Sequence, residues 1–147
     1  MFNIVLYEPE IPPNTGNIAR LCLATNSTLH LIKPLGFEIT NKQLKRAGLD
    51  YWKHVDVRVY ESFEELQKKY ANGNFYYLTT KSKKIYSDFH FKEGDLFVFG
   101  PESRGLPEKY VKQENAITIP MFSDKVRSIN LATAVSVVLY EGIRQVL

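Results

Sequence analysis

The chain has 147 residues, of which 44% are hydrophobic and 24% are charged, proportions that exclude a disordered chain. Its single cysteine, Cys22, excludes an intramolecular disulfide framework and a zinc site built on cysteines. The net charge of +3 is compatible with an RNA partner but is too small to indicate one. We expect one domain over residues 1–147, because this length suits a single hydrophobic core.

The amino-terminal segment is not typical of a secretion signal. It lacks a basic stretch and reaches Glu8 and Pro9 early, whereas a signal peptide needs a basic start followed by an apolar run. No stretch approaches the roughly 18 consecutive apolar residues that a membrane-spanning helix requires. We therefore expect a cytoplasmic protein.

Segments typical of strands alternate along the chain with segments typical of helices. Runs rich in β-branched and aromatic residues predict strands over residues 2–7, 28–34, 55–60, 75–80, 96–99 and 115–120. The spacing of apolar residues predicts helices over residues 17–25, 41–50, 62–73 and 129–146. The third helix begins with Ser62 and Glu65 in the S-x-x-E pattern of a capping box.

This order predicts an α/β fold with a mostly parallel sheet. Several strands are apolar on both faces, so helices must cover both sides of the sheet. Ligands bind such sheets at the loops that follow the carboxyl ends of the strands. Three of these loops, residues 8–20, 100–107 and 119–134, combine Gly or Pro with Asn, Ser, Glu or Arg. We expect the functional site in these loops.

The common nucleotide, hydrolase and metal motifs do not fit the chain. Residues 100–105 have the glycine spacing of a phosphate-binding loop, but Leu106 and Pro107 stand where Lys and Ser or Thr are required. Ser103 lacks the first glycine of a nucleophile elbow. The histidines show no metal-ligand spacing, and His30, inside a predicted strand, is interpreted as structural.

Three segments, PNTGNIAR, FGPESRGLP and IPM…RSINLATAVSVVLYE, resemble in order and position the three motifs of the SPOUT-class (SpoU/TrmH-type) RNA 2′-O-methyltransferases. The resemblance covers essentially the whole chain and is closest to the small TrmL (YibK-type) tRNA enzymes. Two details depart from the family pattern. Ser82 stands in place of a glycine, and the third motif is one residue longer between Met121 and Ser128.

The resemblance implies both a fold and an activity. The fold would be a parallel α/β sheet whose C-terminal part is tied in a deep trefoil knot. The activity would be methyl transfer from S-adenosylmethionine to the ribose 2′-oxygen of the wobble nucleotide in the tRNA anticodon region. That nucleotide would be a cytidine or a 5-carboxymethylaminomethyluridine.

The resemblance also implies which residues form the site. Gly100 and Gly105 would let the backbone pass close to backbone and cofactor, where a Cβ atom would collide. Arg20 would be essential, but a guanidinium is a poor base, so we expect it to orient the substrate phosphate and ribose. The other expected catalytic residues are Asn17, Glu102 and Tyr140. The expected cofactor-binding residues are Leu78, Gly100, Ile119, Met121, Ser128 and Leu131, and the expected substrate-binding residues are Asn14, Arg104 and Asn130. We expect no metal ion in the site.

Several of these residues also have plausible structural roles. Asn14 or Asn17 would cap the first helix, and Ser128 or Asn130 the last, because Asn and Ser are favoured at helix starts. Glu102 would be a solvated charge. Two basic groups would be either solvated surface or contacts to RNA phosphates; these are Lys81, Lys83 and Lys84, and Lys42, Lys45 and Arg46.

The last predicted helix is apolar on almost every side. Leu131, Val135 and Leu139 form one stripe, while Ala132 and Val137 extend the apolar surface around the helix. Such a helix is buried on more than one side, either in the core of a monomer or against a second subunit. We predict a homodimer, and the resemblance implies that each active site is completed by the partner subunit. For function, two alternatives stay open: a SPOUT methyltransferase acting on ribosomal RNA, and an RNA-binding module without catalysis.

Overall fold

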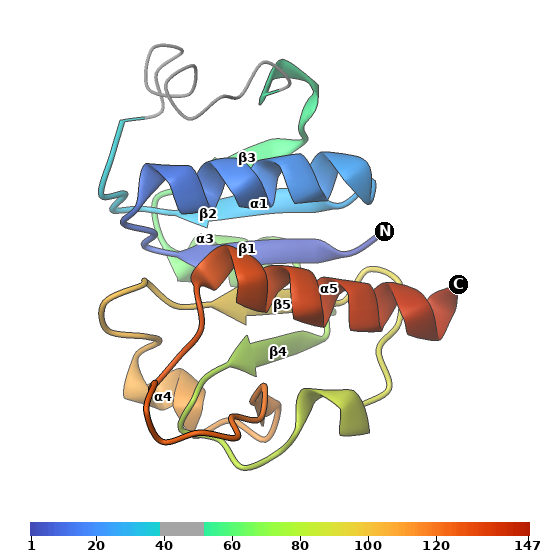
Figure 1. The fold of residues 1–147 in the computed structure, drawn as a ribbon. Coiled ribbons are helices and arrows are strands. Elements are labelled where there is room, and N and C mark those ends of the chain that lie inside the picture. The colour runs from blue at the N-terminus through green and yellow to red at the C-terminus, as the bar shows by residue number, and fades with distance from the viewer. Residues whose placement is uncertain (39–51) are drawn as a thin grey trace.

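The computed structural model describes residues 1–38 and 52–147. In this part of the chain the strands form one sheet in the order β3-β2-β1-β5-β4-β6 (Figure 1). All strand pairs are parallel, which confirms the predicted parallel sheet. The predicted helix over residues 41–50, with Lys42, Lys45 and Arg46, lies outside the described residues. The strands are β1 (Asn3–Tyr7), β2 (Thr28–Ile32), β3 (Val57–Tyr60), β4 (Phe75–Leu78), β5 (Leu96–Phe99) and β6 (Ala116–Ile117).

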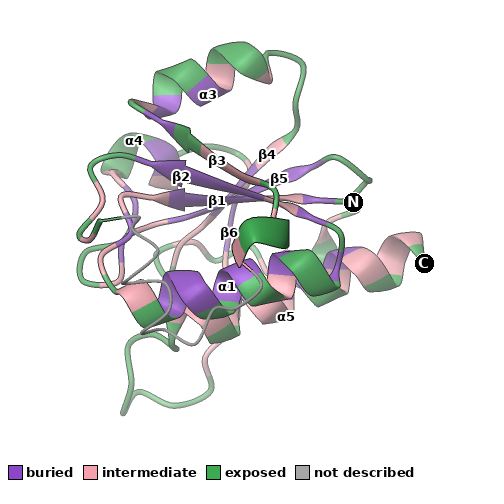
Figure 2. Ribbon diagram, turned by 90° about the horizontal axis from the view of Figure 1, so that it is seen from above, coloured by how far each residue is buried: buried purple, intermediate pink, exposed green. Residues whose placement is uncertain are grey.

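Helices cover both faces of the sheet, as predicted. Figure 2 shows α1 (Pro12–Ala24) and α5 (Leu131–Val146) on one face, and α3 (Phe63–Lys69) and α4 (Glu108–Val111) on the other. Two short 3-10 turns, η1 (Trp52–His54) and η2 (Tyr86–Asp88), lie in connecting segments. Within the described ranges, no helix is long and apolar enough to cross a membrane.

Two apolar layers fill the space between the sheet and its helices, because successive side chains of a strand point to opposite faces. On the side of α1 and α5, Ile4 and Leu6 of β1 pack with Ile18 and Val138. On the other side, Val5 belongs to a layer rich in aromatic rings. These rings are Tyr60, Phe63, Tyr77 and Tyr110.

Helix α1 begins at Pro12, earlier than the predicted start at residue 17. Ile11 precedes it in an extended conformation (φ −109°, ψ 109°), and prolines occupy the first two helical positions. Proline suits these positions because its φ is already helical and its missing N–H has no helical partner there. Asn14 and Asn17 therefore lie inside the helix, and the prediction that one of them caps it is wrong.

Other element boundaries follow local hydrogen bonds. The predicted cap of α3 is confirmed, since the Ser62 hydroxyl accepts a hydrogen bond from the backbone N–H of Glu65 (3.3 Å). The Glu65 carboxylate accepts from the backbone N–H of Glu61 (3.0 Å), one residue before the position that a capping box predicts. Strand β6 covers only two of the six predicted residues, and α4 was not predicted.

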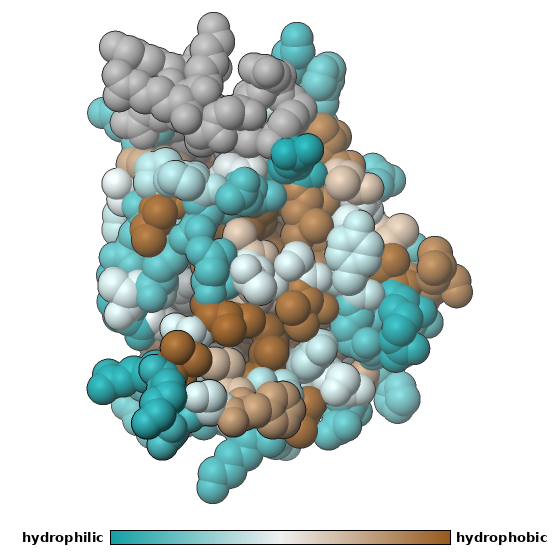
Figure 3. All heavy atoms as spheres, in the orientation of Figure 1, coloured by the Kyte–Doolittle hydropathy of each residue, from teal (hydrophilic) through white to brown (hydrophobic). Residues whose placement is uncertain are grey.

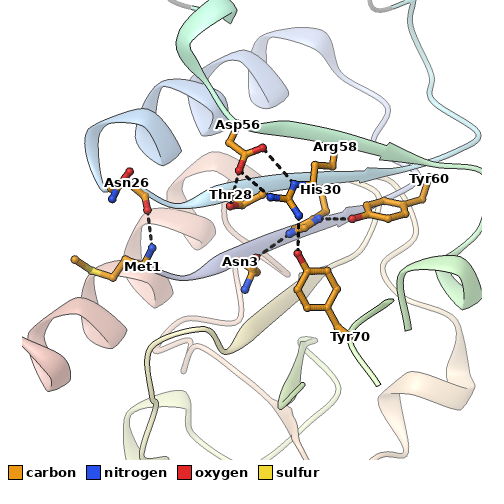
Figure 4. A network of polar contacts seen from close by, with 9 residues as sticks. All are labelled: Met1, Asn3, Asn26, Thr28, His30, Asp56, Arg58, Tyr60 and Tyr70. Atoms are coloured by element: carbon orange, nitrogen blue, oxygen red, sulfur yellow. Dashed lines mark hydrogen bonds and ion pairs between the residues drawn. The ribbon is translucent and has the colours of Figure 1, made fainter. Parts of the chain in front are cut away.

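His30 in β2 is fully buried and bonded at both ring nitrogens (Figure 4). The Tyr60 hydroxyl lies 3.0 Å from Nδ1, and Oδ1 of Asn3 lies 2.9 Å from Nε2. Because the Asn3 oxygen can only accept, we assign the ring proton to Nε2, and Nδ1 accepts from Tyr60. Burial, with a smaller contribution from Arg58, lowers the pKa of His30 to about 4. The structural interpretation of this histidine is confirmed.

Candidate functional site

The loops that follow β4, β5 and β6 meet at one cavity of about 680 Å³. β4 pairs in parallel with both β5 and β6, so the carboxyl ends of the three strands lie at the same edge of the sheet. The starts of α1 and α5 complete the wall with Asn14 and Asn130. The cavity therefore lies where the sequence predicted the functional site.

A close approach of two backbone segments shapes the cavity wall at Gly100. A Cβ atom added there would overlap the backbone carbon of Gly105 and the backbone nitrogen of Leu106, so the predicted reason for this glycine is confirmed. Gly105 differs, because a Cβ atom on it would meet no described atom within 4 Å. Its φ of +70° lies in the left-handed region that side chains rarely adopt. The expectation that a Cβ on Gly105 would collide with backbone is wrong, since the glycine is required for its backbone conformation.

The loop after β5 is bound to the loop after β1 by hydrogen bonds in both directions. The Glu102 carboxylate accepts from the backbone N–H groups of Glu10 (3.2 Å) and Ile11 (2.6 Å). In return, the Glu10 carboxylate accepts from the backbone N–H (2.8 Å) and the hydroxyl (2.7 Å) of Ser103. We call this set of contacts the double clasp. These hydrogen bonds from Ser103 hold the pKa of Glu10 below its usual value.

The double clasp bears on two predicted site residues. The expectation that Glu102 is only a solvated charge is wrong, because each of its carboxylate oxygens binds a backbone N–H group just before α1. Arg104, expected to bind the substrate, forms an ion pair with Glu8 while lining the cavity. Sequence reasoning missed Glu8 and Glu10, and the only signal was the repeated Pro-Glu in both loops.

All six expected cofactor-binding residues line the cavity. They come from different parts of the chain, and each lies at the end of a strand, in a loop that follows one, or at the start of α5. Their role in binding a cofactor stays a prediction. The six are Leu78, Gly100, Ile119, Met121, Ser128 and Leu131. The sequence did not predict Thr79, Thr80 or Leu106, which also line the cavity.

Two asparagines link the starts of the two helices on this face of the sheet. Nδ2 of Asn130 donates to Oδ1 of Asn14 over 3.0 Å. Oδ1 of Asn130 accepts from the backbone N–H of Thr133 (3.2 Å) and so caps α5. Of the two residues expected at this cap, Asn130 therefore fills the position and Ser128 does not. A capping role leaves Asn130 on the cavity wall, where the substrate-binding expectation stays a prediction.

The expected catalytic residues do not all meet in the main cavity. Glu102 lines it, but Asn17 and Arg20 lie in a second hollow of about 430 Å³ between α1 and α5. Asn130 borders both spaces. Tyr140 is 52% exposed, lies farther along α5 and lines neither space. Within the described part of one subunit, the catalytic set is therefore divided between two surfaces.

Polar and basic residues of the β4 loop lie beside the cavity. Lys81 lines it, whereas the ammonium group of Lys84 donates to the backbone oxygen of Glu114 over 2.8 Å. Ser82, where the motif resemblance led us to expect a glycine, donates its hydroxyl proton to the backbone oxygen of Ala116 (2.6 Å). This bond ties the β4 loop to β6. Among residues 1–38 and 52–147, no group of three or more His, Cys, Asp or Glu could hold a metal ion.

Known proteins resemble this chain over nearly its full length. A tRNA (cytidine(34)-2′-O)-methyltransferase of Methylovorus glucosotrophus is 51% identical, over 99% of this chain and 96% of that protein. A protein of the same name from Saccharophagus degradans is 49% identical over the same shares. A solved structure described as "Structural insights into the 2-OH methylation of C/U34 on tRNA" is 46% identical, with a TM-score of 0.93, over 99% of this chain and 96% of that one.

The same relationship appears at the level of the family. The model described as the SpoU rRNA Methylase family matches residues 1–140, which include the first two motifs, the third up to its last residue, and every strand of the sheet. The motif resemblance, the parallel sheet with its cavity, and relatives of nearly equal length agree. The chain belongs to the SpoU methylase family.

Proposed function

We propose that this protein is a tRNA methyltransferase that modifies the ribose 2′-oxygen of cytidine or uridine at position 34. The observation that carries the proposal is the full-length similarity to relatives named for this reaction, one of them 51% identical. The neighbour described for C/U34 supports a uridine substrate as well as cytidine. The 5-carboxymethylaminomethyl form of that uridine follows from the motif resemblance.

S-adenosylmethionine is the proposed methyl donor, and the cavity at the ends of β4, β5 and β6 is its proposed site. A volume of about 680 Å³ suits a cofactor of this size. Leu78, Ile119 and Leu131 would contact its apolar parts, and backbone groups near Gly100 and Ser128 would bind its polar parts. When bound, the cofactor supplies a methyl group already activated by a positively charged sulfur. The proposed site contains no metal.

The reaction breaks the bond between the methyl carbon and sulfur, forms a bond to the ribose oxygen, and releases the hydroxyl proton. Positioning supplies much of the rate in such a transfer. Arg20 is the proposed residue that binds the substrate phosphate and orients the ribose, with Asn17 beside it in the same hollow. Tyr140 would act from its separate position farther along α5. Glu102 would hold the cavity wall, since both of its oxygens already bind backbone N–H groups.

The proposed enzyme is a homodimer joined through the face that carries α1 and α5. Figure 3 shows apolar side chains gathered on this face, and the hollow there is lined in part by Leu21, Ala24 and Ala132. Arg20 lies in that hollow, which supports an active site completed by the partner subunit. A monomeric mass in light scattering at micromolar concentration would refute the dimer.

Three further features belong to the same proposal. A trefoil knot in the C-terminal part is supported by membership in the family. One methyltransferase domain over residues 1–147 is supported by relatives of nearly equal length. A cytoplasmic location is supported by tRNA as the proposed substrate.

Ribosomal RNA is the competing substrate, because the family description itself names rRNA. The relatives that are about half identical name tRNA instead, and they cover the chain from end to end. Similarity at this level outweighs a description that covers the whole family. No observation favours an RNA-binding module without catalysis.

The deciding experiment measures transfer of labelled methyl groups from S-adenosylmethionine to total tRNA that lacks this modification, followed by nuclease mapping. Label at nucleotide 34 that is lost in Arg20→Ala would support the reaction and its site. Lys68→Ala removes one positive charge from the opposite face of the sheet and should leave transfer unchanged. Label in ribosomal RNA instead would overturn the substrate. Absence of both transfer and cofactor binding in the wild type would overturn the enzyme.

A further inference from the structure

Phe122 is 96% exposed, which is unusual for an aromatic side chain. Among the large hydrophobic residues that the structure describes, only the terminal Leu147 is more exposed. A solvated phenyl ring gains nothing from the core of its own subunit. Phe122 is also not explained by the proposed chemistry, which uses its neighbour Met121.

The position of Phe122 relates it to the main cavity. Met121 and Arg127 both line the cavity, and residues 122–126 form the exposed tip of the loop between them. In Figure 1 this loop is part of the orange to red stretch that leads into the start of α5. The loop tip therefore lies at the edge of the cavity.

The charges around the ring favour a polyanion over an apolar protein surface. Lys125 lies in the tip and Arg127 follows it, and these two cations outnumber Asp124, the acidic residue of the tip. Neither cation forms an ion pair with another described residue. Lys81, in the loop after β4, lines the same cavity and likewise has no ion pair within the described residues. An exposed aromatic ring among cations is the arrangement by which proteins bind single-stranded RNA, with bases stacked on the ring and phosphates near the cations.

We propose that Phe122 stacks on an unpaired base adjacent to the nucleotide whose ribose is methylated, while Lys125 and Arg127 contact the flanking phosphates. This inference rests on the proposed RNA methyltransferase function and adds a substrate contact to it. Stacking uses the face of a base and not its hydrogen-bonding edge, so Phe122 selects an unpaired loop over a duplex. The loop tip thus explains how a small catalytic unit recognises a single-stranded target.

The test compares wild type with Phe122→Ala, Phe122→Trp and Phe122→Leu in methyl transfer to unmodified tRNA. We expect kcat/KM to fall about 5- to 150-fold in Phe122→Ala, which corresponds to about 1–3 kcal/mol per stacked base. Phe122→Trp should stay close to wild type because it keeps an aromatic face. Phe122→Leu should resemble Phe122→Ala. Wild-type activity in Phe122→Leu would overturn stacking.

A second readout reports stacking even where no methyl is transferred. An anticodon stem-loop is prepared with 2-aminopurine on either side of the target nucleotide, and fluorescence is followed on binding. Wild type and Phe122→Trp should quench one of the two probes, and Phe122→Ala should not. If wild type binds the stem-loop without transfer but quenches, the proposed reaction fails while the stacking stands. Equal fluorescence in wild type and Phe122→Ala would overturn the stacking.

Two controls separate this role from packing or assembly. The affinity for S-adenosylmethionine in calorimetry and the mass in light scattering should be equal in wild type and Phe122→Ala. A smaller mass for Phe122→Ala would overturn the inference, because the ring would then be covered by a second subunit and not by RNA.

Discussion

Replacing His30 by Gln should remove one well-defined part of the pH dependence of stability. The folded-state pKa of His30 is about 4, against an ordinary value of 6.5. Between these pH values the unfolded chain binds a proton at this histidine and the folded protein does not. Stability from the neutral buried ring is therefore fully present above pH 6.5 and is lost as the pH falls toward 4. A shift of this size corresponds to about 3 kcal/mol.

The structure explains why the folded protein rejects this proton. Nδ1 would have to donate where it now accepts from the Tyr60 hydroxyl, and Arg58 contributes a repelling positive charge nearby. Figure 4 shows Arg58 joined to Asp56 and to the Tyr70 hydroxyl beside the histidine. The Asp56 charge acts in the opposite direction but does not outweigh burial.

The assay is urea unfolding of wild type and His30→Gln between pH 4 and 7.5. The variant should be less stable than wild type above pH 6.5, and the difference should shrink by about 3 kcal/mol as the pH falls to 4. Carboxylates with lowered pKa values, such as Glu10 and Glu141, titrate in both proteins and cancel in the difference. His90→Gln, the same substitution at an exposed position, is the control for the change of side chain itself. A constant difference for His30→Gln across this range would refute the reasoning.

Two further substitutions test the cavity wall. Gly100→Ala should weaken S-adenosylmethionine binding at least tenfold in calorimetry, because the added Cβ atom would displace the backbone at Gly105 and Leu106. The same displacement should lower the free energy of unfolding in urea by about 1–3 kcal/mol. Unchanged affinity would contradict this role of Gly100. Glu102→Gln should lower the free energy of unfolding by about 1–3 kcal/mol, since one of the two N–H groups just before α1, those of Glu10 and Ile11, loses its acceptor. Glu93→Gln, at an exposed carboxylate, is the control, and equal losses in the two variants would contradict the role of the double clasp.

The parallel sheet could be predicted from the sequence because its signal is local. The run of apolar residues at β5 (Leu96–Phe99) corresponds to a strand that is buried at all positions, as a central parallel strand must be. The start of α1 was missed because Pro12 and Pro13 resemble loop residues until their place in the first helical turn is known. Strand β6 was predicted too long, since only residues 116 and 117 pair with β4 and Thr118 adds a single isolated bridge to Ile85.

Only those residues of the site that belong to a sequence motif could be predicted. Gly100 and Asn130 belong to the family motifs, and the cavity brings them together. The double clasp depends on two loops about ninety positions apart in sequence, and no local pattern signals that encounter. The separation of Arg20 from the main cavity was equally hidden, because it depends on the faces that α1 presents once packed.

The double clasp also limits when the contacts before α1 can form during synthesis of the chain. Two backbone N–H groups just before α1, those of Glu10 and Ile11, have their acceptor far along the chain. The acceptor is Glu102, 91 residues farther along. At about 5–20 residues per second of synthesis, Glu102 is added to the growing chain roughly 5 to 20 s after Ile11. Until the loop after β5 has been made, the N–H groups of Glu10 and Ile11 lack their Glu102 acceptor, and the entry to α1 is held by local contacts alone.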